Sequence, residues 1–190
     1  IDTQNKSGSW GSPDKSRPRQ IFVGSVAAHK VFESATTALC CMALMEAKDI
    51  GVDVDAPLKR GVDFLMRMEP TRRSRGDELY CVWSLAYVTQ CLSRCALRGE
   101  CGYTKEQYVR NIRRWIDYIE RYQSDVGGWG YYDFDVGAQR PCGDHSASFT
   151  TATILLALRE AKQAGVPVDA RLFKQGVSVI RRLRTPDKTY

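Results

Sequence analysis

Apolar residues recur at helical spacing along the chain, in segments of two alternating kinds. Segments of the first kind are apolar on nearly every side, as in the stretches 33–48, 78–98 and 146–162. Each is followed by a segment with only one apolar stripe. A helix that is apolar all round is buried on several sides, whereas a single stripe indicates a surface helix with one face inward. The pattern predicts three helical hairpins, at about 33–69, 78–122 and 146–184.

The single stripes and the residues at their ends define the second helix of each hairpin. The stripe of the first hairpin consists of Leu58, Val62, Leu65 and Met68, and that of the third consists of Leu172, Val177, Ile180 and Leu183. Before these stripes, Gly51 and Gly165 are expected to end the preceding helices, and Asp55 and Asp169 to cap the next ones. In the middle hairpin, Thr104-Lys105-Glu106-Gln107 is typical of a capping box.

The first and third hairpins are copies of one repeat. Residues 34–58 and 148–172 align without a gap, and 15 of the 25 positions are identical. With one inserted residue, the match extends to Gly61-Val62 and Gly176-Val177. Because no segment shows the alternation of a strand, we predict an all-α fold. Gly8 to Pro13 and Arg17-Pro18-Arg19 indicate that residues 1–30 are mostly loop, within a single domain that spans 1–190.

A second motif also occurs twice, each time with the pattern Gln-x-x-x-Gly-x-Trp followed by glycine. Its residues are Gln4, Gly8 and Trp10 in the first copy, and Gln123, Gly127 and Trp129 in the second. We interpret it as structural. The glutamine amide can satisfy free carbonyls at a helix end, glycine permits a tight turn, and tryptophan packs that end onto its neighbours.

A buried helix, a surface helix and then this motif resemble the terpenoid cyclase and protein prenyltransferase superfamily, in particular bacterial proteins with squalene-cyclase-type repeats. The resemblance covers nearly the whole chain and includes Gly-Gly-Trp-Gly-Tyr-Tyr at 127–132 and Ser-Phe-Thr-Thr-Ala-Thr at 148–153. It implies an α/α toroid of inner and outer helices. Three hairpins would form about half of such a ring, so we expect a partial toroid that is part of a longer chain.

The family's chemistry is only partly represented. Asp53-Val54-Asp55-Ala56 lacks the final carboxylate of the Asp-x-Asp-Asp acid that the resemblance associates with cyclases, and its second Asp stands where a helix cap belongs. We therefore expect no catalytic residue here, and a scaffold or a surface that binds an apolar ligand or partner. The alternative is part of an enzyme that acts on isoprenoids, such as a squalene-cyclase-like isomerase.

A zinc-dependent prenyltransferase is a further alternative. Asp77 and Cys81 are four residues apart on one helix, and His145 opens a later one, while Cys142 and Asp144 offer another cluster nearby. In the family that this resembles, however, the Asp and Cys ligands are two residues apart. Asp144 or His145 can equally cap a helix, and Cys81 can be a core residue. We predict no metal and no cofactor.

Aromatic residues mark the candidate binding surface. Tyr80, Trp83 and Tyr87 recur at spacings of three and four, which gives one aromatic helix face. Smaller residues on the neighbouring helices could stand opposite and leave room for an isoprenoid or another flat apolar ligand; they are Ala38, Cys41, Met45, Thr151 and Leu155. The alternative is that the aromatic residues fill the core between helices.

The loop 131–140 is the second candidate, because it is long, aromatic and acidic. With it, the candidate binding residues are Tyr80, Trp83, Tyr87, Tyr131, Tyr132, Asp144 and His145. The alternative is that its rings pack over helix ends beside Trp129.

Composition adds limits on the partners. The net charge is +6, and the densest basic clusters, Arg72-Arg73-x-Arg75 and Arg181-Arg182-x-Arg184, are interpreted as solvated helix ends, so we expect no nucleic-acid partner. No apolar stretch is long enough to cross a membrane. The seven cysteines include no C-x-x-C pair, which argues against zinc ribbons and fingers. Cys40, Cys41, Cys81 and Cys91 lie inside apolar helical runs as small buried side chains, which favours reduced thiols and a cytoplasmic location. The partners that we expect are an apolar or isoprenoid ligand, and the rest of a longer chain or a second copy.

Overall fold

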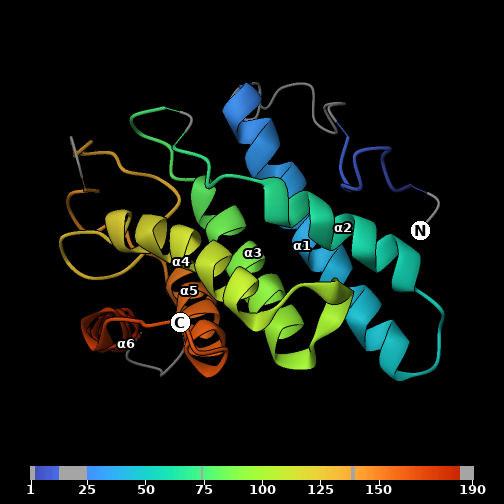
Figure 1. Ribbon diagram of the computed structural model, residues 1–190. Coiled ribbons are helices and arrows are strands. Elements are labelled where there is room, and N and C mark those ends of the chain that lie inside the picture. The colour runs from blue at the N-terminus through green and yellow to red at the C-terminus, as the bar shows by residue number, and fades with distance from the viewer. Residues whose placement is uncertain (1–2, 13–24, 74, 138–139, 185–190) are drawn as a thin grey trace.

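Six α-helices form the computed structural model, which describes residues 3–12, 25–73, 75–137 and 140–184 (Figure 1). Within these residues no strand forms, and only isolated bridges join residues 75, 78 and 132. The predicted all-α class is confirmed. Pro13, Arg17-Pro18-Arg19, Ala138 and Gln139 lie outside the described residues. None of the described helices combines the length and the apolar character that crossing a membrane requires.

The helices are arranged in two layers, as the alternating pattern predicts. The first layer consists of α1 (Val26–Asp49), α3 (Cys81–Arg98) and α5 (Ser148–Gln163). Helix α3 lies between α1 and α5 and contacts both (Figure 1). The second layer consists of α2 (Asp55–Arg67), α4 (Lys105–Arg121) and α6 (Ala170–Arg182), and these pack on α1, α3 and α5 in turn. A short 3₁₀ turn, η2 (Glu100–Gly102), follows α3.

Burial follows position in this array. Helix α3, in the middle, is buried on both flanks, and Trp115, Ile112 and Ile116 of α4 are completely buried. The capping box at Thr104 and Gln107 is confirmed. Gly51 and Gly165 follow the ends of α1 and α5 with φ of +87° and +95°, a conformation that suits glycine and terminates a helix.

Three details of the sequence prediction are wrong. Helix α1 begins at Val26, capped by the Ser25 hydroxyl, and not at the predicted start, residue 33. Asp55 is the first residue of α2 and Val54 holds the cap position, whereas Asp169 does cap α6 as predicted.

The third error concerns the stripe on α6. Val177 is 38% exposed, and the buried residues of this helix are Leu172, Gly176 and Val179. The phase of α6 matches that of α2, since Gly176 lies against the Trp129 ring as Gly61 lies against the Trp10 ring. Val177 is exposed because, in the described part of the chain, α6 packs mainly on α5, whereas α2 contacts α3 and η2 as well as α1.

Candidate functional site

The predicted aromatic face forms at the start of α3. Tyr80 occupies the N-cap position, and Trp83 and Tyr87 follow on the same side of the helix. All three side chains are half-buried. The rings of Trp83 and Tyr87 stack with their centroids 6.1 Å apart. The face is therefore neither closed core nor fully open surface.

The loop after Trp129 brings two more predicted residues to this face. The Leu79 N–H donates to the Tyr131 carbonyl at 2.8 Å, and the Asp133 N–H donates to the Asp77 carbonyl at 2.9 Å. These bonds dock the loop beside Tyr80, whose hydroxyl lies 2.7 Å from that of Tyr132. Burial, together with this hydrogen bond, raises the pKa of Tyr80.

Three phenylalanines complete the surface; Phe134 lies in the predicted candidate loop, whereas the sequence analysis missed Phe32 and Phe149. Phe32 comes from α1, Phe149 from α5, and Phe134 from the loop. Neighbouring rings contact one another, with centroid separations from 4.6 to 6.5 Å. We call the whole set the aromatic face: Phe32, Tyr80, Trp83, Tyr87, Tyr131, Tyr132, Phe134 and Phe149.

The small residues predicted to stand opposite these rings do not border an open space beside them, because four of the five are completely buried. Ala38, Cys41, Met45 and Thr151 are buried within the helix layers, and Leu155 lies toward Gly176 of α6. The neighbours that α1 and α5 provide are the rings of Phe32 and Phe149. Each adds a lone aromatic residue to an aliphatic helix, so no periodic signal in its own segment marks it.

An ion pair holds the loop in place. Asp133 is fully buried, and its Oδ2 accepts from the Arg73 guanidinium at 3.1 Å and from the Gly137 N–H at 3.1 Å. Arg73 also donates to the Gly137 carbonyl, and its backbone N–H donates to the Tyr122 hydroxyl. Its side chain is only 14% exposed, so the prediction of a solvated arginine is wrong at this position.

The remaining two predicted residues lie at and beyond the edge of the aromatic face. His145 makes an edge-on contact with Phe134, and its Nε2 lies 2.9 Å from Asp135 Oδ2. Asp144 instead accepts from Arg182 of α6 at 3.0 Å. Neither residue caps α5, whose N-cap position is held by Ala147. The structure therefore brings His145 to the aromatic face, but not Asp144.

The alternative zinc set is not assembled. No group of three or more His, Cys, Asp and Glu side chains in the described ranges is arranged to hold a metal ion. Cys81 is buried in the core, and burial raises the pKa of its thiol to about 12. All seven cysteines are free thiols. The string nearest to the cyclase acid is also remote from the aromatic face. Asp53 and Asp55 lie past the C-terminal end of α1, whereas Phe32 of the aromatic face lies near the beginning of that helix.

The two glutamine–tryptophan motifs have matching geometry. Gln4 Nε2 donates to the Gly8 carbonyl at 2.8 Å, and Gln123 Nε2 donates to the Gly127 carbonyl at 2.9 Å. The glutamine thus closes its own loop, and the expectation that it binds free carbonyls at a helix end is wrong. Gly8 and Gly127 have φ of +93° and +102°, so both turns require glycine.

Each tryptophan anchors its loop to the next first-layer helix. The backbone N–H of Trp10 donates to the Thr37 hydroxyl at 2.9 Å, and the backbone N–H of Trp129 donates to the Thr151 hydroxyl at 3.1 Å. The Trp129 indole also donates to the carbonyl of Ile119 in the last turn of α4 at 2.9 Å. The tryptophan therefore satisfies the helix-end carbonyl, the role predicted for glutamine.

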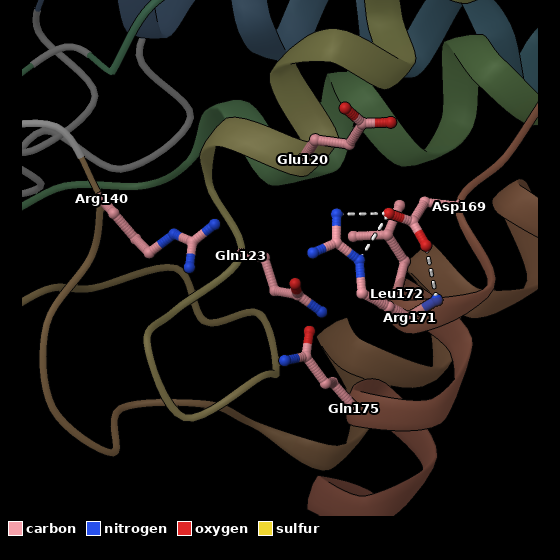
Figure 2. A pocket seen from close by; sticks show the side chains of 7 residues that line it. All are labelled: Glu120, Gln123, Arg140, Asp169, Arg171, Leu172 and Gln175. Atoms are coloured by element: carbon pink, nitrogen blue, oxygen red, sulfur yellow. Dashed lines mark hydrogen bonds and ion pairs between the residues drawn. The ribbon is translucent and has the colours of Figure 1, made fainter.

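A polar pocket of about 160 Å³ lies between the end of α4 and the beginning of α6 (Figure 2). Its side chains are largely occupied with structural contacts. Arg171 binds Asp169 through its side chain and its backbone N–H, Gln123 binds within its motif, and Glu120 accepts from Arg113. A second pocket, of about 480 Å³, is lined by Lys48, which pairs with Asp55 and Glu100. Neither pocket includes a residue of the aromatic face.

Comparison of the chain with family models, with curated proteins and with solved structures gave no match. The resemblance to cyclase and prenyltransferase repeats therefore rests on the repeat and motif residues themselves.

Proposed function

We propose that this protein is a helical-repeat scaffold whose aromatic face binds a flat or branched apolar ligand of the isoprenoid class. One observation carries the proposal. Eight aromatic side chains converge from α1, α3, α5 and one loop, and yet Phe134 and Phe149 remain 67% and 51% exposed. Exposed apolar surface that gathers in one place is typical of a binding site.

The polar groups around the rings suit an amphipathic ligand. The hydroxyls of Tyr80 and Tyr132 lie among the rings and can bind a ligand hydroxyl. Farther along α3, Arg94 binds Glu160 of α5 through two hydrogen bonds of 3.0 Å, which fixes the spacing of the two helices. The resemblance to terpenoid cyclase and prenyltransferase repeats supports the isoprenoid class and the closure of such hairpins into a toroid.

Binding, rather than catalysis, is the better-supported activity. A cyclase of the resembled type needs a carboxylic acid aimed at its ligand. The two carboxylates of the loop that carries Tyr131 and Tyr132 are already engaged, Asp133 by Arg73 and Asp135 by His145. We therefore assign the aromatic face a ligand-holding role.

Titration with farnesol, an isoprenoid alcohol, tests the proposal through tryptophan fluorescence. Trp83 is half-buried in the aromatic face, whereas Trp10, Trp115 and Trp129 are buried elsewhere. We expect saturable quenching of the Trp83 emission. Phe149→Ser should weaken binding by about tenfold, because covering an aromatic ring contributes about 1.5 kcal/mol.

Leu97→Ser is the matched control. Leu97 of α3 is 51% exposed, the same fraction as Phe149, and it lies at the opposite end of α3 from Trp83. This variant should bind farnesol as the unmodified protein does. Equal weakening by both substitutions, or no saturable quenching at all, would exclude the aromatic face as the binding site.

A further inference from the structure

Helices α1 and α5 lie at the two ends of the first layer. Each exposes a flank whose counterpart is buried in the other helix. The repeat makes the comparison direct, because each residue of α1 has a counterpart in α5 that is 114 positions later. Helix α1 packs on α3 with one flank, and α5 packs on α3 with the opposite flank. The middle helix shows the full pattern, since both of its flanks are buried.

On α5, the exposed flank is the one that α1 buries against its neighbour. Met42 of α1 is 8% exposed, and its counterpart Leu156 is 51% exposed. Ala38 is completely buried, and its counterpart Ala152 is only half-buried. Helix α5 therefore presents to solvent the surface that holds α1 against α3.

On α1, the exposed flank is the one that α5 buries. Ala157 of α5 is completely buried, and its counterpart Ala43 is exposed. The same holds along the helix for three further pairs, in which the α5 residue is buried and the α1 residue is exposed or half-buried: Thr150 and Thr36, Ile154 and Cys40, and Ala161 and Ala47. The side chains on this flank are small, so a neighbouring helix can approach closely.

The second layer shows the same asymmetry. Allowing for the inserted residue, Val62 of α2 corresponds to Val177 of α6. Val62 is completely buried, whereas Val177 is 38% exposed. Among the described residues, the exposed surface at the α5 end thus extends over both layers.

We infer that a second copy of this chain docks head to tail, with the α5 end of one copy against the α1 end of the next. The contact would continue the existing α1–α3–α5 packing with one more pair of the same kind. A single chain carries both complementary flanks, so a second copy supplies both partners. The interface is heterologous, because it joins two different surfaces of the chain. Two copies form a closed ring if the rotation between them lets the second α5–α1 contact form as well.

Charge is compatible with this pairing. Arg159 of α5 occupies the position of the buried Met45 in α1, and it is exposed. Asp49 of α1 binds Arg98 of α3 and so lies on the flank that α1 already buries. Glu46 also accepts from Arg98, but its side chain is 63% exposed and lies at the edge of that flank, so it is the carboxylate that can reach Arg159 in the docked pair.

Sedimentation of the chain at increasing concentration tests the inference. Two variants each introduce one charged side chain, on one flank or on the other. Leu156→Glu alters the α5 flank and Ala43→Glu the α1 flank; both positions are exposed, so folding should persist. We expect the unmodified chain to self-associate and each variant alone to associate at least tenfold more weakly. Leu97→Glu, at an equally exposed leucine outside both flanks, should associate normally.

Mixing the two variants distinguishes head-to-tail docking from symmetric docking. The mixture retains one intact interface, between Leu156 of the Ala43→Glu copy and Ala43 of the Leu156→Glu copy, so association should partly return. A symmetric α5–α5 or α1–α1 contact would be sensitive to only one of the substitutions. That result would overturn the inference, as would a chain that stays monomeric at every concentration, association that neither charge weakens, or a mixture that stays dissociated.

Discussion

Trp129→Ala should cost about 3–5 kcal/mol of unfolding free energy, the range for truncating a buried aromatic residue. The Trp129 side chain is completely buried, and its ring packs on Gly176 of α6. Its indole also binds the carbonyl of Ile119 at 2.9 Å, so the truncation leaves a helix-end carbonyl without its partner. One substitution therefore weakens the joint between α4 and α6.

Two further substitutions divide this loss into its causes. Trp129→Phe keeps most of the apolar contact but removes the indole hydrogen bond, which contributes about 1 kcal/mol. Trp83→Ala makes the same truncation in the half-buried aromatic face, where we expect a loss below about 2 kcal/mol because less surface leaves the protein interior.

Urea unfolding of the four proteins measures these differences, provided that the m-values agree. The motif would not be a structural anchor if Trp129→Ala cost less than about 1 kcal/mol. Equal losses for Trp129→Ala and Trp83→Ala would contradict the burial argument.

The remaining predictions concern ion pairs, caps and pH. Arg73→Met should cost about 3–5 kcal/mol in urea unfolding, because it leaves the Asp133 carboxylate buried without its cation; adding Asp133→Asn should recover part of the loss. Asp169→Ala should cost about 1 kcal/mol, and Asp55→Ala less, because only Asp169 caps its helix; thermal melts compare the two. Burial raises the pKa of Cys81 from 9.0 to about 12, so the stability that the neutral thiol provides is complete below pH 9 and is lost as the pH rises toward 12. Urea midpoints across that interval should fall less in Cys81→Ala, and an equal fall in both proteins would show that Cys81 does not contribute.

The helices were predictable because their signals are local. Repetition of residues 34–58 at 148–172, together with single stripes and capping residues, defines both layers without reference to distant contacts. The early start of α1 is also a local signal, since Ser25 precedes Val26 as a cap. The exposure of Val177 could not be predicted from the apolar stripe, because it depends on which helices lie beside α6, a tertiary relationship.

The aromatic face was only partly predictable. Tyr80, Trp83 and Tyr87 share one helix and show a period, but Phe32 and Phe149 are single rings on other helices. They join the surface only because α1 and α5 flank α3, a tertiary relationship. The pairing of Arg73 with Asp133 spans two loops and depends in the same way on how the chain folds back.

The tryptophan indole N–H signals in a ¹⁵N-resolved spectrum test the ligand-binding account most directly. The chain has four tryptophans, so four such signals are expected. Trp10, Trp115 and Trp129 are buried away from the aromatic face, whereas Trp83 forms part of it. On addition of farnesol, the account predicts a saturable shift of the Trp83 signal while the other three stay nearly unchanged. Shifts at the buried tryptophans without one at Trp83, or no shift at any of the four, would contradict it.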